Sequence, residues 1–421
     1  MGLKLSNTVT KMVGSEILKI SGEVKTRVAK GEKIYNLTVG DFNPDIFPIP
    51  EKLRDLIIQN YKKGTTNYPM ANGEPALRKS IVDLYKKNCN VDYVPDEVIV
   101  GAGGRPLLFC IYFSIIDEGD GVIYPVPSWN NEHYCILTHA KSYLVETKAE
   151  DHFMPQPDDL RPYLKDANLI AINSPLNPSG TVISKEALSD ICEMVLAENK
   201  RRGPEQKALY LLYDQIYSQL TFGDAKHYNP VSLYPEMKPY TIIVDGASKW
   251  LAGTGVRVGW ALGPKPLMLK IKTLLGHVGA WSPKPEQLAT AEFLQNKAMD
   301  EYLDVFRKRI VSRLEGFYEI FSKQKEKGYP VDVIAPEAAI YLTVELNLVG
   351  ATTADNKKLE SVEAVFEYIL NEAGVALVPF YAFGASRTLP WFRLSIGTTR
   401  SEDIAIIEKQ LEDALQKLTF E

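Results

Sequence analysis

The chain has 421 residues, of which 45% are hydrophobic and 24% are charged, and its formal net charge at pH 7 is −5. This composition is typical of a folded globular protein, and the length allows two or three domains, each with its own core. A mildly acidic chain without a basic block argues against nucleic acid as the main partner, and no apolar run reaches the ~18 residues that a membrane span needs.

The middle of the chain predicts alternating strands and helices. Short apolar strands are expected at 97–103, 121–127, 142–147, 169–175, 208–217 and 241–246. A buried helix is expected at 105–116, and an amphipathic helix at 184–203 with Ser184 as its N-cap. Nearly continuous apolar strands separated by helices are typical of a mostly parallel sheet covered on both faces. We therefore predict a large α/β domain here.

The last third of the chain has a different pattern. A long charged helix at 297–327 precedes expected strands at 331–335 and 340–346, a helix at 361–374, a strand at 391–398 and a closing helix from Ser401. This grouping predicts a smaller α+β domain. The first 50 residues lack the strand–helix alternation and are expected to pack with it. The predicted division is an N-terminal segment at 1–50, a large domain at 51–310 and a small domain at 311–421.

The cysteines and the N-terminal residues indicate the cellular compartment in which the protein is expected. Cys89, Cys110, Cys135 and Cys192 form no CxxC pair, and no cysteine–histidine cluster has zinc spacing. The first residues contain no apolar segment of the kind found in secretory signals. We expect a cytoplasmic protein with reduced thiols and no bound metal.

Polar and glycine-rich segments follow several of the expected strands. They are Gly103-Gly104-Arg105, Asn173 to Asn177, Asp214 and Lys249. In an open α/β sheet, ligands bind beyond the carboxyl ends of the strands. These residues are therefore expected to meet at one edge of the sheet.

Lys249 and Arg257 lie in "VDGASKWLAGTGVRVGWALGP" (244–264), where small residues surround one lysine and one arginine. An average lysine is a solvated surface cation, but Lys249 follows Gly-Ala-Ser, so nothing bulky shields it. An arginine is a fixed cation suited to a phosphate, whereas a lysine can lose its proton and attack a carbonyl carbon. A Schiff base to pyridoxal phosphate needs both groups.

Three other features fit that cofactor. The turn "GAGGRP" (101–106) would present free N–H groups to a phosphate at the start of a helix. Asp214, if buried beneath a pyridine nitrogen, would keep the nitrogen protonated and make the ring an electron sink. Trp129 would offer a π surface to the face of the pyridine ring. Each residue also has a structural explanation, as a turn residue for Asp214 and as core packing for Trp129.

With these features in place, the chain resembles the class I and II aminotransferases of the fold type I pyridoxal phosphate (aspartate aminotransferase) superfamily. The most specific motifs are "NSPLNPSG" (173–180), "YDQIY" (213–217) and "SKWLAGTGVRVG" (248–259). The stretches "LTVGDFNPDIFPIP" (37–50), "NYPMANGEPALRKSI" (67–81) and "WFRLSIGTT" (391–399) extend the resemblance over nearly the whole chain. The chain departs from the family at Gly246, where a hydroxyl residue is common.

The resemblance implies roles for the residues that would hold the cofactor. Lys249 would form the Schiff base and then move the substrate proton, and Asp214 would pair with the pyridine nitrogen. Asn177 and Tyr217 would hydrogen-bond the phenolic oxygen of the ring. The remaining cofactor-binding residues are Arg257 with Gly104 and Arg105 at the phosphate, Ser248, Trp129, and Tyr68, which would reach the phosphate of the neighbouring subunit.

The substrate would be held through its α-carboxylate. The resemblance implies that Arg393 clamps this carboxylate with two parallel hydrogen bonds, that Gly40 adds a backbone donor, and that Asn177 also contacts the substrate. In "GHVGAWSPKPEQ" (276–287), where related enzymes specific for dicarboxylates can supply an arginine from the partner subunit, this chain has Trp281 and Lys284. That weakens a strict preference for aspartate, and Trp281 would suit an aromatic or apolar side chain.

The implied enzyme is a pyridoxal-phosphate-dependent transaminase. It would exchange an amino group between an L-amino acid and a 2-oxo acid by a ping-pong mechanism, as a homodimer with shared active sites. C–S lyases and other β-eliminating or decarboxylating members share nearly all these residues and are an alternative. A pyridoxal-phosphate-sensing regulator is a second alternative, but the first 50 residues leave no room for a DNA-binding domain.

Overall fold

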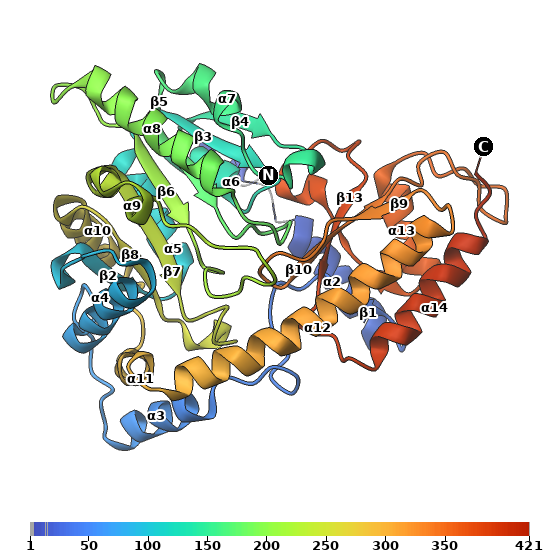
Figure 1. Cartoon of the computed structure of the whole chain (residues 1–421), viewed down its shortest axis with the longest axis horizontal. Coiled ribbons are helices and arrows are strands. Elements are labelled where there is room, and N and C mark those ends of the chain that lie inside the picture. Colours follow the sequence, from blue (N-terminus) through green and yellow to red (C-terminus); the bar gives the residue numbers. More distant parts are fainter. Residues whose placement is uncertain (1–3, 13, 15, 421) are drawn as a thin grey trace.

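A seven-stranded sheet forms the centre of the computed structural model, which describes residues 4–12, 14 and 16–420 (Figure 1). Its strands are β2 (Val98–Gly101), β3 (Gly121–Val126), β4 (Lys141–Glu146), β5 (Ala167–Asn173), β6 (Tyr210–Asp214), β7 (Thr241–Gly246) and β8 (Gly259–Leu262). Their order is β2-β8-β7-β6-β5-β3-β4. Strands β3 to β7 pair in parallel, and β8 runs antiparallel to β2 and β7. The predicted α/β fold with a mostly parallel sheet is confirmed.

Both faces of this sheet are covered by helices. One apolar cluster joins one face to α5 (Gly104–Ile115), α6 (Asn131–Thr138) and α10 (Lys265–Val278). Another joins the opposite face to α8 (Lys185–Arg202). Val122 and Ile123, neighbours in β3, belong to different clusters, because successive side chains of a strand point to opposite faces. Burial on both sides explains the continuous apolar strands.

The N-cap predicted for α8 is present. The Ser184 hydroxyl oxygen accepts a hydrogen bond from the backbone N–H of Ala187 at 3.0 Å, which satisfies one of the free N–H groups at the helix start. Two short helices complete this part of the chain: α7 (Pro157–Leu160) lies between β4 and β5, and α9 (Pro230–Leu233) lies between β6 and β7.

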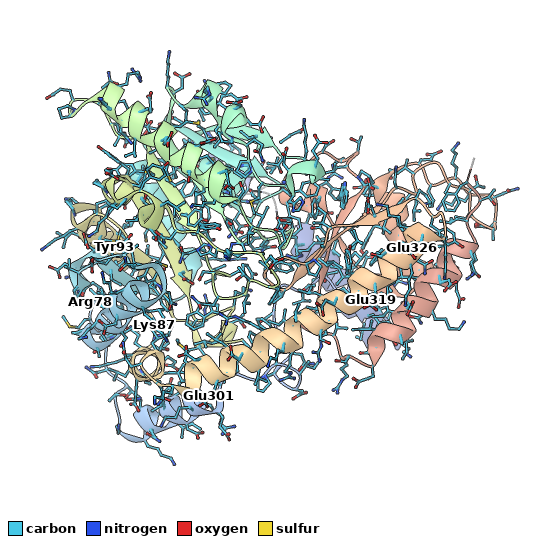
Figure 2. The ribbon with its side chains drawn as sticks, viewed as in Figure 1. Arg78, Lys87, Tyr93, Glu301, Glu319 and Glu326 are labelled. Atoms are coloured by element: carbon cyan, nitrogen blue, oxygen red, sulfur yellow. The ribbon has the colours of Figure 1, made fainter. Side chains whose placement is uncertain are left out.

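Three of the helices that were not predicted lie beside the large sheet and are joined through α11; α6 and α10 were not predicted either. The three are α3 (Glu51–Lys62), α4 (Pro75–Cys89) and α11 (Lys284–Leu294), and α11 contacts the other two. The long helix predicted at 297–327 is α12 (Ala298–Glu326), which runs from this group toward the C-terminal sheet (Figure 1). Figure 2 shows Glu301, Glu319 and Glu326 spread along α12.

The C-terminal third forms a four-stranded antiparallel sheet in the order β12-β13-β10-β9. Its strands are β9 (Val331–Val333), β10 (Tyr341–Leu346), β12 (Val378–Pro379) and β13 (Trp391–Ser395), and its helices are α13 (Val362–Glu372) and α14 (Asp403–Gln416). From the N-terminal segment, which also contains α1 (Asn7–Lys11) and α2 (Glu16–Ala29), β1 (Tyr35–Asn36) pairs in parallel with β11 (Val375–Ala376). The division at residues 50 and 310 stays a proposal, and α12 continues without a break through residue 310.

None of the helices within residues 4–12, 14 and 16–420 combines the length and the apolar character needed to cross a bilayer.

Candidate active site

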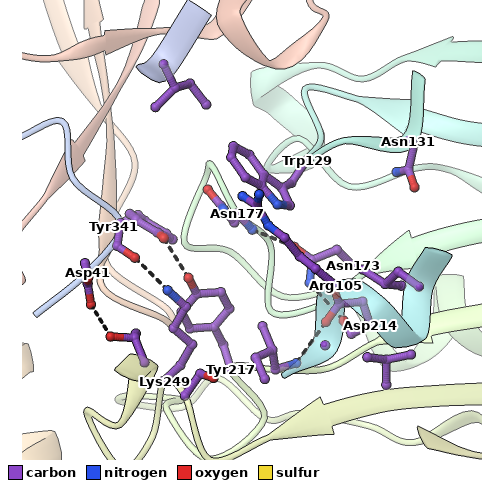
Figure 3. Close-up of a pocket in the computed structure, with 18 of the residues that line it drawn as sticks. Asp41, Arg105, Trp129, Asn131, Asn173, Asn177, Asp214, Tyr217, Lys249 and Tyr341 are labelled. Carbon is purple, nitrogen blue, oxygen red and sulfur yellow. Dashed lines mark hydrogen bonds between the residues drawn. The ribbon is translucent and has the colours of Figure 1, made fainter. Parts of the chain in front are cut away.

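A cavity of about 410 Å³ lies where the carboxyl ends of β5, β6 and β7 face the C-terminal sheet. Figure 3 shows side chains from both parts of the molecule turned toward it. The predicted site residues that line it are Gly40, Gly104, Arg105, Trp129, Asn177, Asp214, Tyr217, Ser248, Lys249, Arg257 and Arg393. A cavity of this size is in the usual range for a cofactor or small-molecule site.

Tyr68 is the predicted site residue that does not line this cavity. It is 82% exposed, and its ring meets that of Trp281 edge-on at a centroid separation of 5.6 Å. Trp281 and Lys284 do not line the cavity either, and Lys284 donates to the side chain of Asn67 at 3.1 Å.

Lys249 is presented to the cavity by a tight turn after β7. Gly246, the last residue of that strand, pairs with Gly259 of β8. A Cβ atom on Gly246 would lie 2.8 Å from the Cα of Gly259 and 2.9 Å from the carbonyl oxygen of Val258, so only glycine fits. This close approach gives a physical reason for the departure from the family at this position. The Nζ of Lys249 donates to the carbonyl oxygen of Gly40 at 2.6 Å.

Asp214 ends β6 and lines the cavity. Its Oδ1 accepts a hydrogen bond from the backbone N–H of Ile216 at 3.1 Å. Burial raises the pKa of Asp214 to about 6, while the Ile216 hydrogen bond and the positive charge of Lys249 act in the opposite direction. The carboxylate is therefore mostly ionised at pH 7 and able to hold a positively charged partner.

Arg257 lies beside the start of α5. The Arg257 guanidinium donates to the carbonyl oxygens of Thr254 at 2.8 Å and of Ala102 at 2.7 Å. Gly103 has φ +88°, and a Cβ atom there would lie 2.5 Å from Nη2 of Arg257, so a side chain would displace the guanidinium. The free N–H groups and the positive end of the dipole of α5 lie beside it, which suits a phosphate.

Arg393 is the most deeply buried cation of the cavity, with 2% exposure. Its Nη1 donates to Oδ1 of Asn177 at 2.9 Å, and its Nη2 donates to the carbonyl oxygen of Thr38. Its Nε is buried without a hydrogen-bond partner, and no carboxylate within the described residues forms an ion pair with it. Burial lowers the pKa of Arg393. A ligand carboxylate would satisfy the unpaired donor and balance the charge.

Two further residues help to order the site: Tyr341, which was not predicted, and Asn173, which was expected at the sheet edge but given no role of its own. Tyr341 of β10 shares a hydrogen bond of 2.6 Å with the hydroxyl of Tyr217. Burial raises the pKa of Tyr217 well above its usual value. Asn173 accepts from the backbone N–H of Asn177 at 2.8 Å and donates to the carbonyl oxygen of Asp214 at 2.9 Å. Asn173 lies in the "NSPLNPSG" motif, whereas nothing in the sequence links Tyr341 with Tyr217.

Trp129 and Arg105 lie together at one wall of the cavity (Figure 3). The guanidinium carbon of Arg105 is 4.7 Å from the centroid of the Trp129 ring, a cation–π contact. The predicted stacking of Trp129 on a pyridine ring stays a prediction, and Arg105 already contacts the indole.

Comparison with known proteins gives one family. The family model described as aminotransferase class I and II matches residues 32–409. An aspartate aminotransferase of Bacillus sp. (strain YM-2) is 30% identical over 97% of this chain and 97% of its own. A probable aspartate/prephenate aminotransferase of Aquifex aeolicus is 29% identical over 97% of this chain and 99% of its own. The crystal structure of the aspartate aminotransferase from Rhizobium meliloti matches with a TM-score of 0.88 at 25% identity, covering 99% of this chain and all of that one.

Proposed function

Because this chain belongs to the class I and II aminotransferase family, we propose that its cavity binds pyridoxal phosphate and moves the amino group of an acidic L-amino acid to a 2-oxo acid. The predictions of the family and of an aminotransferase are confirmed. The observation that supports the finer proposal is the cavity itself. Lys249 and Asp214 face a space whose wall holds the buried guanidinium of Arg393, whose Nε has no hydrogen-bond partner.

The residues present fit the cofactor. Arg257 and the start of α5 would hold its phosphate, and Asp214 would face its pyridine nitrogen. Asn177 and Tyr217 would bond its ring oxygen, and Lys249 would attach it covalently. When bound, the cofactor supplies an electron sink that makes the Cα–H of an amino acid acidic.

The chain's own residues would then position the substrate and move one proton. Arg393 would hold the α-carboxylate through two hydrogen bonds, with Asn177 beside it. The Nζ of Lys249 lies against Gly40, and a Cβ atom on Gly40 would lie 3.6 Å from Nη1 of Arg393. A base at Lys249 is thus beside the carboxylate site, and its Nζ would take the Cα proton.

An acidic side chain is supported by the charges of the cavity. The cations that line it are Arg105, Lys249, Arg257 and Arg393, and the carboxylates are Asp41 and Asp214. With Arg257 at the phosphate, Arg393 at the α-carboxylate and Lys249 as the base, the side chain of Arg105 is the cation left for a second carboxylate. The resemblance had placed Arg105 at the phosphate, and we propose the second carboxylate for its side chain instead. The relatives named above are aspartate or probable aspartate/prephenate aminotransferases. Trp281, the residue that suggested an aromatic substrate, packs on Tyr68.

Replacing Arg105 by glutamine should lower kcat/KM for aspartate and glutamate while leaving alanine and phenylalanine nearly unchanged. A hydrogen bond to a charged group contributes about 1.5–3 kcal/mol, which predicts a loss of roughly ten- to hundredfold. The measurement is the rate with a panel of amino donors and 2-oxoglutarate as acceptor. An equal loss for all donors, with weaker cofactor retention, would instead place Arg105 at the phosphate.

Arg393→Lys is the matching variant and should lower kcat/KM for every donor, because every donor has an α-carboxylate. A lysine keeps the charge but cannot reproduce two parallel hydrogen bonds. We expect a loss of about tenfold or more across the same panel, from one missing charged hydrogen bond. A defect confined to acidic donors would place Arg393 at the side-chain pocket.

A two-fold dimer with shared active sites completes the proposal. Tyr68 is exposed and turned away from the cavity of its own chain, so in an isologous dimer it would serve the site of the opposite subunit. The four cysteines are free, and three of them are buried, which supports a reducing compartment such as the cytoplasm.

A further inference from the structure

A buried carboxyl group, Asp245, lies behind the catalytic residues on the other face of β7. Val244, its neighbour in the strand, lines the cavity, so Asp245 points away from the cavity. It is 3% exposed. Its Oδ1 accepts from the backbone N–H of Gly246 at 2.7 Å and from the indole N–H of Trp250 at 3.4 Å. Its Oδ2 accepts from the amide of Gln215 at 3.3 Å and from the hydroxyl of Ser218 at 3.2 Å.

Three of the four side chains that donate to Asp245 share one property in the sequence. Gln215 directly follows Asp214, Ser218 directly follows Tyr217, and Trp250 directly follows Lys249. The carboxyl group therefore connects the backbone behind three residues that face the cavity. A fourth contact, from the hydroxyl of Tyr85 at 3.3 Å, ties this group to α4.

The orientation of the Gln215 amide is fixed by its other contacts. Asn229 caps α9, because its Oδ1 accepts from the backbone N–H groups of Val231 and Ser232. Its Nδ2 therefore points outward and reaches Oε1 of Gln215 at 3.2 Å, and Nε2 of His227 also lies 3.2 Å from that oxygen. With Oε1 occupied, the Nε2 of Gln215 donates to Oδ2 of Asp245 at 3.3 Å and to the hydroxyl oxygen of Tyr85 at 3.2 Å. Residue 245 therefore has to offer an acceptor to this amide.

The donors and the carboxyl group depend on one another. Burial raises the pKa of Asp245 to about 7, and the hydrogen bonds from Gly246, Gln215, Trp250 and Ser218 act in the opposite direction. The side chains of Tyr85, Gln215, Ser218, Asp245 and Trp250 are all buried. Water therefore cannot replace a lost contact without rearrangement of the loops that carry them.

We infer that Asp245 is a positioning residue for transamination. Through its hydrogen bonds with Gln215, Ser218 and Trp250, it holds the preceding residues Asp214, Tyr217 and Lys249 in fixed positions relative to one another. The inference rests on the proposed roles of those three residues. Misplacement by about 1 Å can cost on the order of 100-fold in rate, and supporting residues of this kind set how precisely a site is held. In the described structure, neither Arg257 nor Arg393 is hydrogen-bonded to Asp245.

Asp245→Asn tests the inference, because it keeps the shape but places a donor opposite the Gln215 amide. We expect kcat for the best amino donor to fall by about ten- to hundredfold, with little change in KM because the carboxylate and phosphate contacts remain. The visible circular dichroism band of the bound cofactor should weaken, because the ring is less firmly oriented. Ile191→Ala, in the core of α8, is the stability control. It should lower the melting temperature without changing kcat or the dichroism band.

Exchanging the carboxyl group of Asp245 and the amide group of Gln215 between the two positions gives the most discriminating comparison. Gln215→Glu alone sets two carboxyl groups against each other and should also lower kcat. In the double variant Asp245→Asn with Gln215→Glu, the new carboxylate accepts from His227 and Asn229 on one oxygen and from the new amide on the other. We expect the double variant to be more active than either single variant, a coupling that independent effects on stability would not produce.

The inference would be overturned by an unchanged kcat and dichroism band in Asp245→Asn. It would also be overturned by a double variant less active than both single variants. If Asp245→Asn fails to fold, Trp250→Phe and Ser218→Ala each remove one donor, and an unchanged kcat and band in both would overturn it equally. A wild-type enzyme without transaminase activity would refute the proposed function itself, whereas an active wild type with unaffected variants would refute only the role of Asp245.

Discussion

Replacing Lys249 by alanine should abolish transamination while the protein stays folded and keeps its phosphate contacts. The variant loses the covalent partner of the cofactor and the proposed base at once, and a general base alone contributes on the order of 10²–10⁴-fold. We therefore expect a loss of about 10⁴-fold or more, measured as single-turnover conversion of the amino donor. The proposed phosphate contacts at Arg257 and the start of α5 are untouched, so the cofactor should remain bound through gel filtration.

Lys409→Ala is the matched control for this experiment. Lys409 lies on α14 and pairs with the exposed Asp413 at 3.0 Å, so its loss should leave turnover unchanged. Substantial turnover in Lys249→Ala, with the control at wild-type level, would mean that another group is the base.

Replacing Asp214 by alanine should have the second largest effect, and the effect should fall on proton removal more than on cofactor binding. Removing one preorganised electrostatic contact costs about 10²–10³-fold in kcat. The measurement is exchange of the substrate Cα hydrogen in deuterated water, set against the amount of cofactor retained. An unchanged exchange rate would show that Asp214 does not face the pyridine nitrogen. Asp214→Asn serves as the control for shape, since it keeps the hydrogen-bonding side chain but not the charge.

The position of the site could be predicted from the sequence because it depends on local patterns. Continuous apolar runs indicated the strands at 169–175, 208–217 and 241–246, and the residues just after them were expected at one sheet edge. The structure has β5, β6 and β7 there, and Asn177, Asp214 and Lys249 line one cavity. Parallel strands place their carboxyl ends on the same side, so the shared edge follows from the parallel direction of these strands.

The contacts that refine the site could not be predicted because they join distant segments. Tyr217 and Tyr341 meet although 124 positions separate them, and their partnership depends on how the C-terminal sheet faces the large one. Asp245 could not be identified from the sequence, because a single acidic residue in an apolar strand forms no periodic pattern. Its contacts with Gln215, Ser218 and Trp250 form only in the folded chain.

Helices α3, α4 and α11 also escaped prediction. Their packing against one another and against α12 buries residues such as Leu53, Leu77 and Ala289, and it is this tertiary burial that stabilises them. In contrast, Ser184 and the amphipathic run after it define α8 locally, and its N-cap was predicted correctly.

Borohydride reduction followed by peptide mapping distinguishes whether this cavity holds pyridoxal phosphate on Lys249. Reduction of the purified enzyme should fix the cofactor irreversibly, and mass spectrometry should find the pyridoxyl group on the peptide that contains Lys249. The Lys249→Ala variant should give no labelled peptide under the same treatment. A pyridoxyl group on any other lysine of the wild-type enzyme, or no pyridoxyl group after saturation with the cofactor, would show that Lys249 does not carry the cofactor.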